Sequence, residues 1–208
     1  FCNEKDYPYQ LKVGVEIPSA MAAAIGRLRS AIRVPFGVNI LWDPIASLAL
    51  ARATGARFIR EVLTGVYESD LGILEPRIGD ITAYRAAIGA SDVALFDNIA
   101  PEFSSALGSR TLADRARGAA FMGMDAILIS GWAAGSPMAV SDLVAAKEAA
   151  PTTSIVANTG VRAERIPEIL AVADGVIVGS AFVSAIERGG PQAARELAAT
   201  IREGLGRS

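Results

Sequence analysis

Two short apolar runs near the C-terminal end constrain the fold most strongly, because each ends in a glycine turn that leads into a helical segment. The runs cover residues 153–157 and 175–179 and are rich in valine and isoleucine. Strands that read as continuous β-branched runs are buried on both faces of a parallel sheet. Parallel neighbours need a crossover connection, and a helix is the usual one. The pair therefore predicts an α/β fold made of strand–helix units.

Similar runs recur along the chain and alternate with amphipathic helical segments. The expected strands cover residues 1–3, 34–41, 57–62, 92–98, 125–130, 153–157 and 175–179. Such alternation is typical of a parallel sheet with right-handed crossovers, which leaves a (β/α)8 barrel or a doubly wound sheet. The sequence has no GxGxxG turn after an early strand and no Walker A motif. Polar residues follow nearly every strand, which favours a barrel with a ring of loops around one mouth.

An eight-stranded barrel needs one strand more than the seven that the pattern predicts. The sequence begins at Phe1 rather than at a methionine. We therefore expect a single TIM (β/α)8 barrel domain over residues 1–208 that is N-terminally incomplete, with its first β/α unit before Phe1.

Several helix ends are marked by capping residues. Asp43 followed by Pro44 is a helix start, and Gly55 is a helix stop. Thr111 with Asp114 predicts a capping box. A final helix is expected over residues 191–203.

Two connections, 64–75 and 99–109, are longer than a strand–helix unit requires. We expect both to be loops, and the length of the first suggests function rather than simple connection.

Composition excludes several classes of function. The 208 residues are 51% hydrophobic and carry 20 basic and 22 acidic side chains, which gives no basic face for nucleic acid. No run approaches the roughly 18 apolar residues of a membrane span. A single cysteine rules out an internal disulfide and favours a reducing compartment, so we expect a cytoplasmic protein. The absence of histidine excludes His-based triads, HExxH zinc sites and histidine acid–base catalysis.

The two glycine turns predict a phosphate site. Backbone N–H groups at a helix N-terminus favour an anion, and the loops after the last two strands of a barrel commonly hold one. The alternative is a pair of ordinary strand-to-helix turns with a serine cap. The expected phosphate-binding residues are Asn158, Thr159, Gly160, Gly179, Ser180 and Ala181.

Polar residues at the ends of earlier strands are candidates for binding the rest of a substrate. Alternation along a strand places Asn39 and Arg60 on the inner face, where an arginine can clamp a carboxylate or a second phosphate. The alternative is that Arg60 and Glu61 form structural ion pairs inside the barrel. The expected substrate-binding residues are Asn39, Arg60, Asn98, Ser130 and Gly131.

Because the chain has no histidine, we expect Asp and Glu side chains to carry out any proton transfer. A partly desolvated carboxylate at a barrel mouth can act near neutral pH. Our expected catalytic residues are Glu4, Asp97 and Glu61, with Glu102 as a further candidate; the alternative is that these are solvated loop charges. No cofactor is expected, although two facing carboxylates could hold a divalent metal.

Longer stretches of the sequence resemble the BtpA/SgcQ family of predicted TIM-barrel proteins. The similar stretches are Val-Pro-Phe-Gly-Val-Asn-Ile-Leu-Trp-Asp (34–43), Ala-Thr-Gly-Ala-Arg-Phe-Ile-Arg-Glu-Val-Leu-Thr-Gly-Val-Tyr (53–67), Asp-Ala-Ile-Leu-Ile-Ser-Gly (125–131), Asn-Thr-Gly-Val (158–161) and Asp-Gly-Val-Ile-Val-Gly-Ser (174–180). The resemblance covers almost the whole chain. It implies a (β/α)8 barrel whose first strand lies upstream of Phe1.

The resemblance implies two alternative functions. One is an enzyme acting on a phosphorylated sugar or nucleotide-like metabolite by isomerase, lyase or glycosyl-bond chemistry, with that small metabolite as its partner. The other is a non-catalytic assembly factor that keeps the barrel, because one branch of the family is associated by name with photosystem I. The lack of histidine, and Val183 where members place a lysine after the last strand, keep the second alternative open. Helices rich in alanine and leucine further predict a homo-oligomer.

Overall fold

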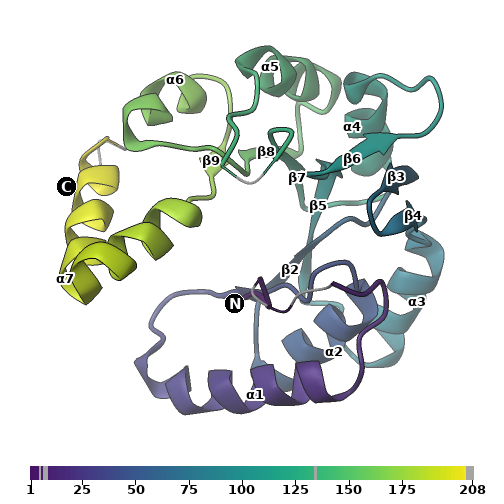
Figure 1. The fold of residues 1–208 in the computed structure, drawn as a ribbon. Coiled ribbons are helices and arrows are strands. Elements are labelled where there is room, and N and C mark those ends of the chain that lie inside the picture. The colour runs from purple at the N-terminus through teal and green to yellow at the C-terminus, as the bar shows by residue number, and fades with distance from the viewer. Residues whose placement is uncertain (5, 7–8, 134, 205–208) are drawn as a thin grey trace.

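Six parallel strands form one curled sheet with the helices along its outer side (Figure 1). The computed structural model describes residues 1–4, 6, 9–133 and 135–204. In sheet order the strands are β1 (Gly37–Val38), β2 (Phe58–Glu61), β5 (Ala94–Ala100), β7 (Ala126–Ile129), β8 (Ser154–Ala157) and β9 (Gly175–Val176). The predicted α/β architecture is therefore confirmed.

Helices connect consecutive strands. The α-helices are α1 (Glu16–Leu28), α2 (Pro44–Thr54), α3 (Ile78–Ala87), α4 (Leu112–Phe121), α5 (Val140–Ala149), α6 (Ile166–Leu170) and α7 (Ser180–Gly204), and two 3-10 turns lie at Arg29–Ala31 and Ala163–Arg165. The caps predicted from sequence are present: Asp43 Oδ1 accepts from Ala46 N at 2.9 Å, and Thr111 and Asp114 form the capping box. The expected final helix is the second half of α7, which kinks at Gly189 and Gly190.

Three expected strands are much shorter than predicted. Of residues 34–41, only Gly37 and Val38 form β1. Val34 is exposed and Pro35 has no N–H to offer a sheet, while residues 39–41 lie beyond the strand and contribute one isolated bridge, from Asn39 to Cys2. Residues 1–3 contribute one parallel bridge, from Cys2 to Asn39. The strand predicted over 175–179 ends at Val176, and residues 177–179 lead into α7.

The two segments expected as long loops, 64–75 and 99–109, contain short strands. These segments form a second, antiparallel sheet in the order β4 (Gly72–Leu74), β3 (Tyr67–Ser69) and β6 (Ser104–Ala106). Tyr67 anchors it, since its ring is buried and its hydroxyl donates to the Ile99 carbonyl at 3.1 Å. The pairing of β3 with β6 joins two connections that are far apart in sequence, so no local pattern reveals it.

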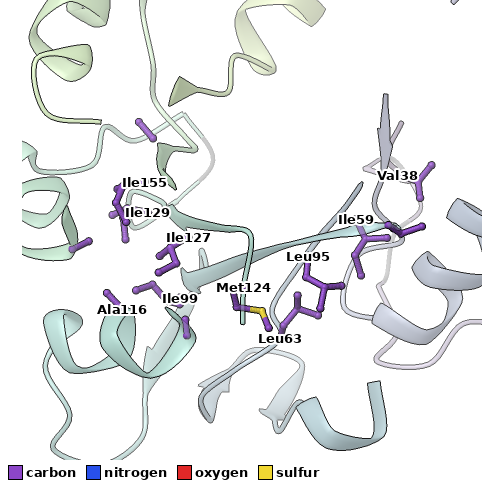
Figure 2. Packing of buried hydrophobic residues seen from close by; sticks show 14 of the residues in the cluster. Val38, Ile59, Leu63, Leu95, Ile99, Ala116, Met124, Ile127, Ile129 and Ile155 are labelled. Atoms are coloured by element: carbon purple, nitrogen blue, oxygen red, sulfur yellow. The ribbon is translucent and has the colours of Figure 1, made fainter. Parts of the chain in front are cut away.

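The hydrophobic core lies between the curled sheet and the helices (Figure 2). Alternate strand residues such as Ile59, Leu95 and Ile127 belong to it, together with helix residues such as Leu48 and Ala116. Because side chains alternate along a strand, the remaining row of each strand faces the concave side of the sheet. One row of side chains on each strand therefore packs against the helices, and the other row lines the inside of the curled sheet.

The described strands form an open sheet, with β9 at one edge and the Cys2 bridge at the other. Closure into eight strands therefore stays a prediction. The last four residues of the single domain expected over residues 1–208, residues 205–208, lie outside the described ranges. None of the described helices combines the length and apolar character that crossing a membrane requires.

Gly160 offers a test of how tightly the turn after β8 is packed. Its φ is +66°, and a Cβ there would lie 2.3 Å from the carbonyl oxygen of Ser136. We expect Gly160→Ala to lower the free energy of unfolding by at least about 1 kcal/mol, through both left-handed strain and the clash.

Gly55→Ala is the matched control in urea denaturation, because Gly55 has φ +74° but open space around its Cβ position. It should cost less than Gly160→Ala. Equal costs would show that Ser136 does not confine the turn.

Candidate functional site

Five successive strands each direct one polar side chain toward the concave side at their carboxyl ends. Each of these residues follows the alternation of its strand, and the residue before each one is buried on the opposite side. The five are Asn39, Arg60, Asn98, Ser130 and Asn158, and all except the half-buried Arg60 are buried. The sequence predicts four of them as substrate-binding residues and Asn158, in a glycine turn, as a phosphate ligand. The structure brings the five side chains together.

Arg60 is the centre of this group. Its Nε donates to Asn158 Oδ1 at 3.0 Å, and its Nη1 donates to Asn39 Oδ1 at 3.1 Å. Its Nη2 lies 3.7 Å from Glu102 Oε1. The guanidinium therefore links strand β2 to β1, to β8 and to the connection after β5.

Asn98 and Ser130 complete the ring. Asn158 Nδ2 donates to Ser130 Oγ at 2.7 Å, and Ser130 Oγ donates to Asn98 Oδ1 at 3.3 Å. Asn98 Nδ2 in turn donates to Glu102 Oε2 at 3.4 Å. We call these six residues, Asn39, Arg60, Asn98, Glu102, Ser130 and Asn158, the polar ring. Every member can hydrogen-bond a hydroxyl or carbonyl group of a small ligand.

Glu61 lies behind the polar ring, on the side of the strand that faces helix α2. Its Oε1 accepts from Asn39 Nδ2 at 2.6 Å and from Ser47 Oγ at 2.7 Å. Burial is the main cause that raises the pKa of Glu61 to about 8, against the lowering effect of both hydrogen bonds. The side chain is therefore largely protonated at neutral pH and fixes the orientation of the Asn39 amide.

Asp97 occupies the equivalent position on β5 and is fully buried. Its Oδ1 accepts from Leu63 N at 2.8 Å and its Oδ2 from Thr64 Oγ1 at 2.6 Å. Burial raises the pKa of Asp97 to about 6, and the hydrogen bonds from Thr64 and Leu63 oppose the rise. In this position Asp97 ties the turn after β2 to β5.

The two expected phosphate turns follow neighbouring strands, since β8 pairs directly with β9. Thr159 Oγ1 accepts from Gly131 N at 2.7 Å, so one turn is tied to the end of β7. Within the described ranges, the N–H groups of Gly179, Ser180 and Ala181 find no protein acceptor, as is usual for the first turn of a helix. These three amides remain available to an anion.

Three aromatic residues lie on connections that follow strands of the curled sheet: Trp42 after β1, Phe103 after β5 and Trp132 after β7. Trp42 and Phe103 have positive φ values, 72° and 54°, which non-glycine residues adopt only under constraint. Phe103 packs edge-on against the exposed Trp132, with ring centroids 6.2 Å apart. Trp42 Nε1 is buried and has no acceptor in the part of the chain that the structure describes. It lines a cavity of about 30 Å³ together with Arg60 and Glu102, among others, which is room for about one water molecule.

Glu4, expected to be catalytic, is exposed and makes no side-chain hydrogen bond to a described member of the polar ring. No group of three or more Asp, Glu or Cys side chains that could hold a metal ion gathers among the described residues.

Two contacts of the site carry no signal in the sequence. Ser47 sits within helix α2 and meets Glu61 only through the packing of that helix on the sheet. Phe103 and Trp132 come from connections after different strands, and only the fold brings them together.

The pKa of Glu61 makes a prediction about stability. A carboxyl group whose pKa is about 8 in the folded protein and about 4.5 in the unfolded chain binds more protons when folded between these values. The free energy of unfolding should therefore fall as pH rises through this window. Glu61→Gln keeps an acceptor for Asn39 and Ser47 but cannot ionise.

Relative to Glu61→Gln, the wild type should lose stability between pH 6 and pH 8, with a slope of up to about 1.4 kcal/mol per pH unit. Urea denaturation across this range measures it, with the exposed Glu148→Gln as control, which should run parallel to the wild type. Parallel curves for Glu61→Gln and wild type would contradict a protonated Glu61.

Solved structures share this fold. The thiamine phosphate pyrophosphorylase from Pyrococcus furiosus superposes with a TM-score of 0.62 at 17% identity, over 94% of this chain and 81% of that one. A mutant tryptophan synthase α-subunit from the same organism gives a TM-score of 0.61 at 19% identity, over 89% and 72%. Both are TIM-barrel enzymes, so the likeness supports a barrel-type α/β fold.

Sequence relatives are closer. The Escherichia coli sgc-region protein SgcQ is 44% identical over 183 residues, which are 88% of this chain and 68% of that protein. The photosystem I biogenesis protein BtpA of Synechocystis is 35% identical over 184 residues, 86% of this chain and 64% of that protein. The chain thus spans about two thirds of the length of these relatives. The model of the BtpA family matches residues 1–194, and the chain therefore belongs to the BtpA family.

Proposed function

We propose that this chain forms the ligand-binding mouth of a (β/α)8-barrel enzyme that acts on a phosphorylated sugar or nucleotide-like metabolite. The observation that carries the proposal is the polar ring. The strand that Asn158 follows, β8, pairs with β9, which leads into α7, and the first amides of α7 have no acceptor among the described residues. The two open edges of the described sheet are β9 and the Cys2 bridge. We propose that the barrel closes to eight strands between these two edges.

The phosphate is bound by the amides of Gly179, Ser180 and Ala181 at the start of α7. A helix N-terminus carries partial positive charge, and its free N–H groups suit a phosphate. Asn158, Thr159 and Gly160 form the adjacent turn. A ligand anchored there extends toward Arg60 over the neighbouring strands, where an arginine can bind a second anionic or carbonyl group.

Glu102 is the carboxylate best placed to move a proton, because it belongs to the polar ring and its side chain is 17% exposed. Arg60 and Asn98 contact it and hold it toward the concave side. Isomerase, lyase and glycosyl-bond reactions all need such an acid or base near the sugar carbons. Glu61 and Asp97, behind the strands, act as positioning residues for Asn39 and for the turn at Thr64.

Known proteins support the same class of ligand without defining the reaction. The structurally similar thiamine phosphate pyrophosphorylase is named for a phosphorylated compound. The relative SgcQ is named only for its genomic region, and the relative BtpA for photosystem I biogenesis. A non-catalytic assembly factor of the latter kind is the alternative that the experiment below distinguishes.

The phosphate site can be tested by comparing ribose 5-phosphate with ribose in a thermal-shift titration. Ligand that binds only the folded state raises the melting temperature by mass action, so ribose 5-phosphate should stabilise the protein and ribose should not, or far less. Ser180→Pro removes one amide at a helix position where proline is tolerated, and should reduce the stabilisation.

Ser180→Ala is the matched control, because it removes the hydroxyl and keeps the amide. It should retain most of the shift. If neither ribose 5-phosphate nor other phosphosugars stabilise the wild type, the enzyme proposal fails and the assembly-factor alternative is favoured.

A further inference from the structure

A second cavity, of about 200 Å³, lies away from the polar ring, between helices α3 and α4 and the turn after β2. Thr64 and Gly65 form one wall, Ile78 and Met122 supply apolar surface, and Arg110 and Arg115 supply positive charge. None of the polar-ring residues lines it. Its ligand would therefore be independent of the site proposed above.

The cavity exists because two neighbouring helices are kept apart. Helix α4 packs along α5, and α1 along α2, whereas α3 and α4 contact each other little. Arg110 precedes α4 and folds back over it, so that its Nη1 would lie 3.7 Å from a Cβ placed on Gly118. Because Gly118 has no side chain, the Arg110 guanidinium fits over α4, and both Arg110 and Arg115 line the cavity there.

Both arginines lack an acidic partner among the described residues. Neither takes part in an ion pair there, and Arg115 Nε is buried with no acceptor. Of the carboxylates that could serve, Asp97 is already bonded to Leu63 and Thr64, and Asp114 to Thr111 and Arg117. A buried donor on a charged group without an acceptor is costly, so the unpaired Arg115 Nε calls for a partner such as a water molecule or an anion.

We propose that this cavity binds a compact oxyanion, a phosphate or carboxylate group, between Arg110 and Arg115. The planar guanidinium fork matches the oxygens of either group, and Arg115 Nε supplies a donor already positioned inside the protein. Ile78 and Met122 pack against the apolar part of a small molecule that carries the anion. Thr64 links the site to Asp97 and hence to strand β5.

Amide NMR with inorganic phosphate as the probe tests the site, using sodium chloride at matched ionic strength as the reference. Phosphate should cause saturable shifts of the Gly65 and Gly118 amides. Arg115→Met should abolish these shifts or raise the apparent Kd about tenfold or more, since hydrogen bonds to charged groups are strong. The shifts of Gly179 and Ala181, which report the mouth, should be unchanged.

Arg117→Met is the matched control, because Arg117 lies on the same helix but faces solvent and pairs with Asp114. It should leave the Gly65 and Gly118 shifts as in the wild type. If Arg115→Met does not fold, Arg110→Met, at an exposed position, serves in its place. The proposal is overturned if the wild type shows no saturable shift at Gly65 and Gly118, or if the arginine variant keeps the wild-type affinity.

Separate probes distinguish this site from the mouth. Loss of the Gly179 and Ala181 shifts in Ser180→Pro, with those of Gly65 and Gly118 kept, shows two independent sites. Carboxylate sources are compared by repeating the titration with acetate, which should shift the same Gly65 and Gly118 amides if the cavity takes any compact oxyanion.

Discussion

The structure depends on how the inner face of the sheet accommodates the charge of Arg60. A half-buried guanidinium is stabilised only when its donors are matched by acceptors, and here they come from three other segments of the chain. Asn39, Asn158 and Glu102 supply them. The bond from Arg60 to Asn158 joins the ends of β2 and β8, which are not neighbours in the sheet. It belongs to the polar carboxyl end of the concave side, while the opposite face of each strand packs against helices.

The two faces of the strands therefore carry different kinds of residue: the polar ring lies on the inner face, and the buried positioning residues lie on the outer face. Arg60 and Glu102 are partly exposed, whereas Glu61 and Asp97 point to the outer face of their strands and are buried there. Burial keeps Glu61 protonated at neutral pH, so it can stabilise the Asn39 amide without adding a charge. The same division puts the Arg110 and Arg115 cavity outside the sheet, separate from the mouth.

The parts of this structure that follow from local rules could be predicted from the sequence. Asp43 and Thr111 cap helices because the capping residues lie within one turn, and Asn39 and Arg60 face inward because strands alternate. The pairing of β3 with β6 could not be predicted, since its hydrogen bonds join distant segments. Membership of the BtpA family was correctly inferred from the motifs. The catalytic roles of Glu4, Glu61 and Asp97 stay predictions, since Glu4 is exposed and Glu61 and Asp97 are buried behind the polar ring.

In the proposed function, the amides at the start of α7 and the polar ring bind one phosphorylated ligand together. A crystal structure of the protein with ribose 5-phosphate shows whether they do. We expect phosphate density at Gly179, Ser180 and Ala181, with the sugar extending over Asn158 toward Arg60 and Glu102. Density with the phosphate elsewhere, or a sugar that points away from Arg60, would overturn the proposal.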